Sequence, residues 1–263
     1  MTGTGKWGDL GPRIASGVVL AAVGLGAIWA GGWWFTALAL LAGTLMIWEL
    51  ALMLDRDRPR DAILLAGLAA LGFGAALGAD RLVEALPLAA PAVAALVMPR
   101  RGKLILALYG TAVLVAAAGL VAFRAEHGML WLGWLIAVVV VTDIAGYFAG
   151  RLIGGPKFWP RVSPKKTWSG TLAGWVAAAA VGFVFLSFTT AGPDLPWISA
   201  ALAFASQMGD AAESAIKRHA GVKDSSGLIP GHGGLLDRFD GVLGAALFML
   251  VVAQVVVVPV VKV

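Results

Sequence analysis

Apolar stretches long enough to cross a lipid bilayer recur along most of this chain of 263 residues. A membrane-spanning helix needs about 20 mostly apolar residues. We identify nine such stretches, at 14–30, 33–54, 62–79, 82–98, 104–123, 128–150, 170–190, 195–216 and 238–259. Because 60% of the residues are hydrophobic and only 13% are charged, a water-soluble core could not hide this much apolar surface. The sequence therefore predicts an all-α, polytopic helical membrane protein with about nine transmembrane helices.

The distribution of basic residues predicts how these helices are oriented. If the N-terminus is cytoplasmic and nine helices alternate in direction, 17 of the 20 Lys and Arg residues fall on the cytoplasmic side. Only Arg81, Arg124 and Lys262 fall outside. Cytoplasmic loops of membrane proteins carry such an excess of Lys and Arg. We therefore expect a multi-pass protein of the plasma or inner membrane, with a cytoplasmic N-terminus and a site that faces the cytoplasm.

Charge and cysteine content narrow the classes of function. The chain contains no cysteine, which excludes disulfides, thiol nucleophiles and cysteine metal sites. Its net charge is +5, and in a membrane protein basic loops set the topology and contact anionic lipid headgroups. We expect membrane lipid as the partner and no nucleic acid, and we leave a homodimer open. The stretch 14–30 ends in Ile28-Trp29-Ala30, a poor cleavage site, so we expect it to be a span and no cleaved signal peptide.

We interpret residues 1–263 as a single membrane domain in two parts. The spans in 1–125 contain little polar chemistry, whereas 126–263 contain most of it together with two long cytoplasmic loops, 151–169 and 217–237. Long loops in an otherwise compact protein are frequent places of function. Function is therefore expected in the second part.

Acidic residues near the cytoplasmic helix ends are the main site candidates. Asp210 and Glu213 lie three residues apart in one helix, and Asp237 and Asp240 have the same spacing in the next. Each pair shares a helix face. Ionisable groups at membrane depth are costly, and they usually face protein or water. A set of oxygen ligands without cysteine suits a hard cation such as Mg²⁺.

Each acid also has a purely structural interpretation. Asp237 and Asp240 can stabilise the N-terminal end of their helix, where carboxylates favour the dipole. Asp210 and Glu213 can form internal salt bridges with Lys217 or Arg218. These alternatives stay open. Asp143, in the stretch 128–150, is equally open between a structural pair and a site. For Glu49 we prefer a pair with a loop arginine.

Two loops combine cations, hydroxyls and glycines in a way that suits phosphate groups. The loop 217–237 carries Lys217, Arg218 and Lys223, followed by His232 between glycines. Cations beside glycine amides at a helix N-terminus suit a phosphate. The loop 151–169 contains Ser163-Pro164-Lys165-Lys166-Thr167. For Lys157 and Arg161 we prefer a role in topology and lipid contact. The residues alone thus predict a metal-assisted site for a phosphorylated substrate.

Residues 214–240 read SAIKRHAGVKDSSGLIPGHGGLLDRFD. This segment resembles the signature of phosphatidate cytidylyltransferases (CDP-diacylglycerol synthases), S-x-hydrophobic-K-R-x4-K-D followed by P-x-H-G-G-x2-D-R-x-D. Residues 142–151, TDIAGYFAGR, and 163–168, SPKKTW, also resemble the family. The resemblance covers residues 140–241 strongly. The family usually has Glu before the next glycine, whereas this chain has Ser169.

The resemblance implies that CTP and phosphatidic acid give CDP-diacylglycerol and pyrophosphate, with a divalent cation, usually Mg²⁺, which K⁺ can accompany. It implies that the metal ligands are Asp210, Asp237 and Asp240, with Glu213 close by. The catalytic group would be these three aspartates with Lys217, Arg218 and His232. The substrate-binding group would comprise Asp143, Ser163, Lys165, Lys166, Thr167, Ser214, Lys223, Asp224, Gly233, Gly234 and Arg238.

Three other functions are compatible with parts of the sequence. An ion-coupled transporter also uses carboxylates in its helices, but near the middle of the membrane and on paired broken helices. A CDP-alcohol phosphotransferase shares the D-x2-D-G of Asp237–Gly241 but requires further residues that do not follow. A lipid-binding scaffold would keep its lipid binding after Asp237→Asn, a change that should abolish enzymatic turnover.

Overall fold

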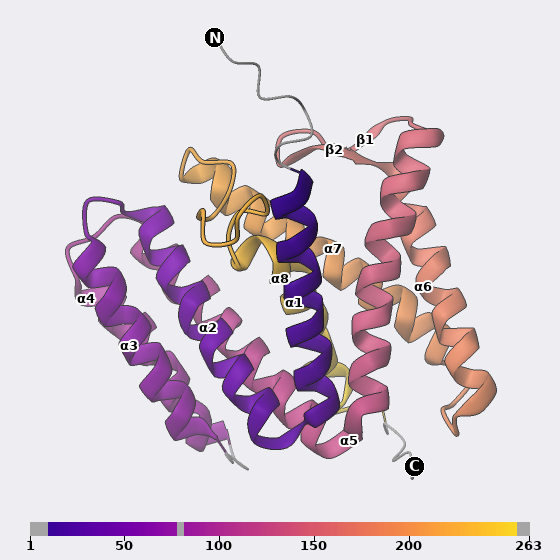
Figure 1. Cartoon of the computed structure of the whole chain (residues 1–263), viewed down its shortest axis with the longest axis horizontal. Coiled ribbons are helices and arrows are strands. Elements are labelled where there is room, and N and C mark those ends of the chain that lie inside the picture. Colours follow the sequence, from indigo (N-terminus) through magenta and orange to yellow (C-terminus); the bar gives the residue numbers. More distant parts are fainter. Residues whose placement is uncertain (1–9, 78–81, 257–263) are drawn as a thin grey trace. The chain divides into compact units, whose positions relative to one another are not determined.

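The computed structural model of the chain describes residues 10–77 and 82–256 (Figure 1). Helix is present at each of the nine predicted ranges, as far as these ranges are described. In order, the elements are α1 (Leu10–Ala30), α2 (Gly32–Leu54), α3 (Pro59–Ala76), the 3₁₀ helix η1 (Leu82–Ala89), α4 (Ala90–Val97), α5 (Lys103–Leu152), β1 (Lys157–Trp159), β2 (Ser163–Thr167), α6 (Trp168–Phe188), α7 (Leu195–His219) and α8 (Leu236–Val252).

The helices confirm an all-α polytopic membrane protein. In the described part of the chain, α2, α3, α5 and α6 are long and apolar enough to cross a membrane, and Ile14–Ala30 and Ala85–Val97 are shorter apolar helices. Nine transmembrane helices and a cytoplasmic N-terminus stay predictions. The basic residues Lys6, Arg81 and Lys262, used for the orientation, lie outside the described residues.

Three of the predicted spans differ from a single, separate α-helix. The stretches 104–123 and 128–150 both lie in α5, whose two helical segments meet at Gly128, with φ 83° and ψ −178°. A positive φ of this size favours glycine. The stretch 82–98 is split into η1 and α4. Pro87 lies inside η1, where its missing N–H and fixed φ disfavour a regular α-helix.

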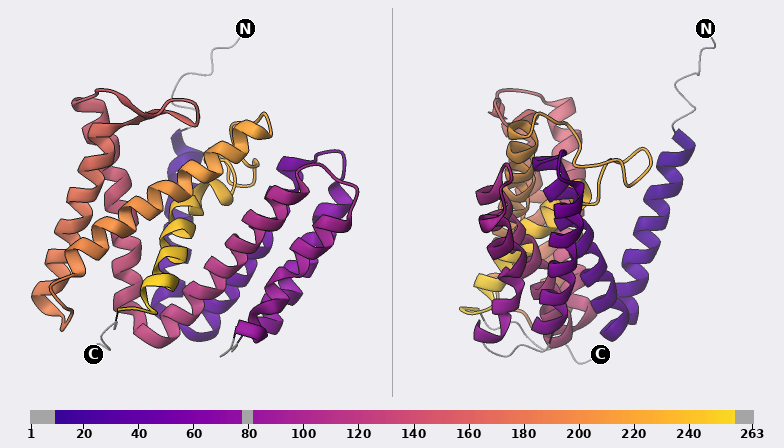
Figure 2. Two further views of the ribbon diagram at one scale, coloured as in Figure 1. Left: turned by 180° about the vertical axis from the view of Figure 1, so that it is seen from behind. Right: turned by 90° about the vertical axis from the view of Figure 1, so that its left-hand side faces the viewer.

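The loop 151–169 contains a β-hairpin that the sequence pattern did not predict. Strands β1 and β2 pair antiparallel, with Lys157 opposite Thr167 and Trp159 opposite Ser163. Thr167 then begins α6 as its N-cap, because its side chain accepts a hydrogen bond from the backbone N–H of Gly170 at 3.2 Å. Figure 2 (left) shows the hairpin at the N-terminal end of α6.

The chain divides into two compact units that interleave in the sequence. Unit 1 comprises residues 1–114 and 220–239, and unit 2 comprises residues 115–219 and 240–263. Each unit is described separately below. The prediction of one membrane domain with a division near residue 125 stays a prediction.

In unit 1 the C-terminal end of α2 is held by the loop 98–102. Arg100 is 7% exposed, and its Nη2 donates to the carbonyl of Ala51 at 2.6 Å. Asp55 accepts a hydrogen bond from the backbone N–H of Arg101 at 3.0 Å. Burial lowers the pKa of the Arg100 guanidinium below its usual range. These contacts fix the end of the helix that carries Glu49.

In unit 2 glycines let α6 approach its neighbours closely. A side chain on Gly170 would place its Cβ 2.5 Å from the carbonyl oxygen of Gly146 in α5. A side chain on Gly182 would place its Cβ 2.6 Å from the Cα of Pro196 in α7. Small residues allow this close packing of membrane helices. The buried indole of Trp134 donates to Ser199 at 3.1 Å, which ties α5 to α7.

Candidate active site

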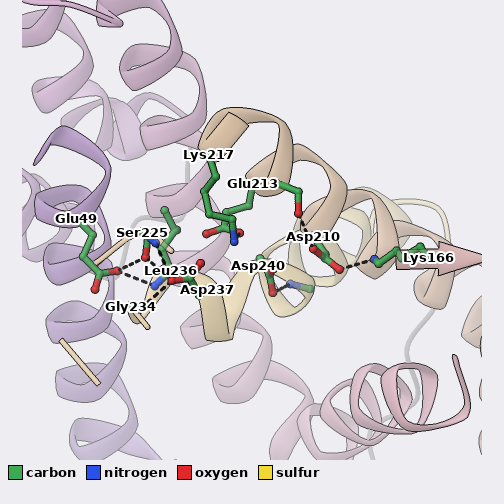
Figure 3. A network of polar contacts seen from close by, with 12 residues as sticks. Glu49, Lys166, Asp210, Glu213, Lys217, Ser225, Gly234, Leu236, Asp237 and Asp240 are labelled. Atoms are coloured by element: carbon green, nitrogen blue, oxygen red, sulfur yellow. Dashed lines mark hydrogen bonds and ion pairs between the residues drawn. The ribbon is translucent and has the colours of Figure 1, made fainter. Parts of the chain in front are cut away.

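Each unit contains a cluster of polar groups, which come from side chains and from backbone amides (Figure 3). In unit 1 the Glu49 cluster comprises Glu49, Ser225, Ser226, Gly234, Leu235, Leu236 and Asp237. In unit 2 the Asp210 cluster comprises Lys166, Asp210, Glu213, Ser214, Lys217 and Asp240. The sequence predicted every acid of these clusters as a site candidate except Glu49.

Glu49 is fully buried near the C-terminal end of α2, with 0% exposure. Its Oε1 accepts hydrogen bonds from Ser226 Oγ at 2.6 Å and from the N–H of Leu235 at 2.8 Å. Its Oε2 accepts from the N–H of Leu236 at 2.7 Å and, at 3.4 Å, from Ser225 Oγ. Glu49 thus binds serines and backbone amides, and our expectation of a loop arginine as its partner is wrong.

Asp237 organises the same loop through a single oxygen. Its Oδ2 accepts hydrogen bonds from the N–H and the Oγ of Ser225, at 2.8 and 2.9 Å, and from the N–H of Gly234 at 2.8 Å. Gly234 lies two residues before α8, so this bond holds the segment that leads into the helix. Asp237 lies in the first turn of α8, as the helix-stabilising interpretation expected, and its role as a metal ligand stays a prediction.

The glycines of the Gly-His-Gly-Gly segment are required by this geometry. Gly233 has φ 83°, and its carbonyl accepts from the N–H of Ile229 at 2.8 Å, which closes a tight turn. A Cβ on Gly234 would lie 2.0 Å from Ser225 Oγ and 2.7 Å from Glu49 Oε1. Glycine at 234 therefore leaves the space in which the two carboxylates and the serine meet.

The start of α8 is consequently occupied by the protein's own carboxylates. The N–H groups of Gly234, Leu235 and Leu236 donate to Asp237 and Glu49. A phosphate cradle at these amides was one use that the sequence suggested for Gly233 and Gly234. In this conformation the amides of Gly234, Leu235 and Leu236 are already bonded, so these three are not available to a phosphate.

The other predicted residues of the loop lie at its surface or against α1. Lys223, Asp224 and Arg238 are exposed. The Nδ1 of His232 lies 2.7 Å from the Oγ of Ser16 in α1, and Ser16 Oγ also donates to the carbonyl of Pro230 at 3.0 Å. His232 therefore has a protein partner, and its predicted contact with a ligand stays a prediction.

In the Asp210 cluster, carboxylates are paired with ammonium groups. The Oδ2 of Asp210 in α7 forms an ion pair with Lys166 of β2, and its Oδ1 accepts from Ser214 at 3.2 Å. One turn along α7, Lys217 pairs with Glu213, which has 0% exposure. The internal salt bridge considered for Glu213 is thus confirmed. Asp210 has Lys166 as its partner, a residue 44 positions away in the sequence.

Asp240 lies where α8 approaches α7. A side chain on Gly209 would place its Cβ 2.3 Å from the carbonyl oxygen of Asp240, so the two backbones are close. The Asp240 carboxylate interacts electrostatically with Asp210, Lys217 and Asp143, and its Oδ1 accepts from the N–H of Gly241 at 2.7 Å. Asp240 is therefore repelled by two further acids of unit 2, Asp210 and Asp143, and attracted by Lys217.

This arrangement is compatible with a Mg²⁺ ion held partly by substrate. Among the described residues, no group of three or more His, Cys, Asp or Glu side chains is close enough to hold a metal. Mg²⁺, however, is usually bound by one or two carboxylates together with substrate phosphates and water. Asp210 and Asp240, whose charges repel each other, supply such a pair.

A pocket of about 390 Å³ lies in the same unit, between α5, β2, α6 and α7. Arg151, Lys165 and Lys166 contribute cations to its lining, and Thr142 and Gln207 contribute polar groups. Thr142 precedes Arg151 by nine residues, about 13 Å along a helix, so the pocket extends along two to three turns of α5. Gln207 is held by the indole N–H of Trp175, which donates to its Oε1 at 2.9 Å. Asp143 and Thr167 also line the pocket.

Several of these residues were not identified from the sequence. Glu49 was considered and set aside, and Ser225, Ser226, Thr142, Arg151 and Gln207 were not considered as site residues. Gln207 lies one turn before Asp210 on α7, a spacing that could have indicated it.

Ser163 is half-buried in β2, and Arg218 is exposed at the end of α7. Ser169 donates to the carbonyl of Gly154 at 2.5 Å and so joins the end of α5 to the start of α6.

Comparison with known proteins gives a consistent result. The model of a family described as the cytidylyltransferase family matches residues 11–256. The phosphatidate cytidylyltransferase of Brucella suis biovar 1 is 51% identical over 121 residues, which are 45% of this chain and 45% of that protein. The proteins of the same name from Haemophilus influenzae and Bacillus subtilis are each 39% identical, over 145 and 123 residues.

These matches cover only part of each protein. They span 50% of this chain and 50% of the Haemophilus influenzae protein, and 45% of this chain and 45% of the Bacillus subtilis protein. The chain therefore matches about half the length of these curated relatives.

Proposed function

This chain belongs to the cytidylyltransferase family, and we propose that it transfers the cytidylyl group of CTP to phosphatidic acid, giving CDP-diacylglycerol and pyrophosphate. Several similar proteins carry the name phosphatidate cytidylyltransferase. The observation that carries the proposal is the Asp210 cluster, in the same unit as a pocket whose lining includes Arg151, Lys165 and Lys166. Such a combination suits a nucleoside triphosphate with a bound divalent cation.

The chemistry requires no general base. The second pKa of a phosphate monoester is about 6, so the phosphate of phosphatidic acid is largely a dianion at neutral pH. One of its oxygens attacks the α-phosphorus of CTP, a new P–O bond forms, and the bond to the β-phosphate oxygen breaks as pyrophosphate leaves. The main obstacle is the repulsion between two polyanions, which positive charge must offset.

We assign the cations of the pocket to the nucleotide. Lys165, Lys166 and Arg151 line it, and their charges would bind the phosphates of CTP. Lys166 is also the partner of Asp210, so the side chain that binds a phosphate would lie beside the carboxylate that binds a cation. Ser163 and Thr167 lie at the two ends of β2 and would complete this side.

Asp210 and Asp240 would hold Mg²⁺, which when bound neutralises phosphate charge and orients the leaving pyrophosphate. The resemblance adds Asp237 and Glu213 as ligands, and K⁺ as an additional ion. Asp237 already accepts three hydrogen bonds through Oδ2, and Glu213 neutralises Lys217. We therefore propose Asp210 and Asp240 as the principal ligands and a mainly organising role for the other two.

The location of the substrates fits a membrane protein. The acyl chains of phosphatidic acid stay in the bilayer, whereas CTP is water-soluble, so the phosphates must meet at a membrane surface. The excess of Lys and Arg in the loops that carry the site supports the cytoplasmic surface. A plasma or inner membrane location with nine transmembrane helices completes the proposal, and a homodimer is left open.

The proposal is tested by turnover of the purified protein in lipid nanodiscs. Radiolabelled CTP and phosphatidic acid are supplied with and without Mg²⁺, to the wild type and to Asp210→Asn. We expect labelled CDP-diacylglycerol from the wild type only with Mg²⁺, and a loss of about 100- to 1000-fold in Asp210→Asn. Absence of labelled lipid from the folded wild type, or equal turnover by the variant, would contradict the proposal.

A further inference from the structure

We propose that Glu49 is a positioning residue, whose buried carboxylate holds residues 225–236 in the conformation that the reaction requires. The inference rests on the proposed function for its kinetic part, and on geometry alone for its structural part. Glu49 belongs to α2, in the half of the chain that the sequence signature does not cover.

The contacts of Glu49 connect distant parts of the sequence. Its four donors lie 176 to 187 residues further along the chain. Two are the side chains of Ser225 and Ser226, and two are the backbone amides at the start of α8. A backbone amide, unlike a side chain, cannot leave its acceptor by changing its rotamer. They therefore fix the position of the chain itself relative to α2.

The carboxylate is well suited to this position. A buried charge is tolerated only when it is paired or fully hydrogen-bonded. Among the described residues no Lys or Arg forms an ion pair with Glu49, so its charge is offset by four donors and by the N-terminal dipole of α8. Oε1 accepts one hydroxyl and one amide, whereas Oε2 accepts one amide and shares the hydroxyl proton of Ser225 with Asp237, which lies closer to that hydroxyl.

The anchored segment carries residues that the reaction would use. His232 lies between Ser226 and Leu235, and Lys223 and Asp224 immediately precede Ser225. Asp237 follows Leu236 in the first turn of α8, and Asp240 follows one turn later in the same helix. A shift of residues 225–236 would therefore displace Lys223. It would also change the start of α8, the helix that carries Asp237 and Asp240.

Three substitutions test separately the charge of Glu49, the length of its side chain and one of its hydroxyl donors. In Glu49→Gln the amide NH₂ faces a backbone N–H, so one amide at the start of α8 loses its acceptor. Glu49→Asp keeps the charge but is shorter by one methylene group, and we expect it to restore part of the function. Ser226→Ala removes the bond of 2.6 Å to Oε1 and the acceptor of the Leu228 N–H at 3.0 Å, and it leaves both amides at the start of α8 bound to Glu49.

The matched control is Leu65→Ala in the buried core of α3, in the same unit. It lowers stability through a cavity without touching the loop. Amide hydrogen exchange and steady-state kinetics are measured in nanodiscs, at a temperature at which every variant is folded. Exchange reports the anchoring independently of turnover, so a failure of the proposed function would leave this part of the test intact.

We expect exchange in 225–236 to accelerate about 10- to 100-fold in Glu49→Gln, less in Glu49→Asp and least in Ser226→Ala, with α3 unchanged. We expect kcat to follow the same order, with the KM for phosphatidic acid nearly constant. Leu65→Ala should lower the melting temperature but keep kcat. Unchanged exchange in 225–236, or an equal loss of kcat in Leu65→Ala and Glu49→Gln at equal folded fraction, would overturn the proposal.

Discussion

The Glu49 cluster and the Asp210 cluster both contain buried or half-buried carboxylates, but they satisfy them in opposite ways. In the first, Glu49 and Asp237 accept hydrogen bonds from amides and hydroxyls of the protein. In the second, Asp210 forms an ion pair with the ammonium group of Lys166, and Asp240 interacts with Asp210, Asp143 and Lys217. The first arrangement holds a backbone in place. The second contains carboxylates and an ammonium group that can exchange their present partners for a cation and a phosphate.

The partners of each carboxylate distinguish structural acids from reactive ones better than the spacing of the acids in the sequence does. Asp237 and Asp240 have the same i, i+3 relation as Asp210 and Glu213, and the sequence treats all four alike. Their partners divide them differently, because Asp237 and Glu213 have partners within their own segment. Asp210 and Asp240 each accept one hydrogen bond within their own helix, but they also interact with charged residues of other elements.

Removal of one charge from each cluster should give the largest contrast. Asp240→Asn relieves the repulsion from Asp210 and Asp143, so we expect an unchanged or higher melting temperature with a loss of turnover of about 100- to 1000-fold. Asp237→Asn should also lose turnover, but it weakens the acceptor of three hydrogen bonds. We expect it to cost about 1–3 kcal/mol of stability. Thermal unfolding and turnover are measured on both variants.

Equal destabilisation by the two changes would break the comparison, since both aspartates would then be structural. A stable Asp237→Asn protein without turnover would instead move Asp237 into the reactive cluster.

Loss of a pocket cation should have an intermediate effect. Lys166→Ala removes the partner of Asp210 and a charge from the pocket, so we expect the KM for CTP to rise about tenfold or more with a smaller change in kcat. Lys157→Ala, on the exposed strand β1, is the matched control and should leave the KM for CTP unchanged. The same rise in both variants would indicate a general effect of surface charge and no specific phosphate contact.

Removal of one hydroxyl from each cluster should have the smallest effect and sharpen the contrast most. Ser214→Ala removes a bond of 3.2 Å to Asp210, and we expect turnover to fall about 2- to 10-fold without loss of stability. Ser225→Ala removes a bond of 2.9 Å to Asp237, and we expect a cost of about 1 kcal/mol in stability. Denaturation curves and initial rates of both proteins distinguish the two cases. A reversed pattern would exchange the roles of the clusters.

The helices could be predicted because the apolar length needed to span a bilayer leaves a strong local signal. Most helix ends agree within a few residues, as in 33–54 against Gly32–Leu54. Local signals do not describe how a long apolar segment bends, so the break at Gly128 inside α5 was predicted only as a gap between two spans. The strands β1 and β2 have only three and five residues, which is too short for an alternating pattern to be recognised in the sequence.

The site could be predicted in its residue types but only partly in its pairs. The i, i+4 pair of Glu213 and Lys217 follows from helix geometry. The pairs of Asp210 with Lys166 and of Glu49 with the loop join elements far apart in the sequence, and nothing in one sequence indicates such a contact. Glu49 was therefore expected to pair with a loop arginine.

The hydrogen bonds of Glu49 also limit how this protein can be divided or recombined. All of the recognisable signature lies in the C-terminal half, yet two amides at the start of α8 depend on a carboxylate from the second helix of the N-terminal half. A fragment that begins after residue 125 would retain the signature and lose its support. A chimera that joins halves from two relatives would have to present a carboxylate at the same depth of the second helix.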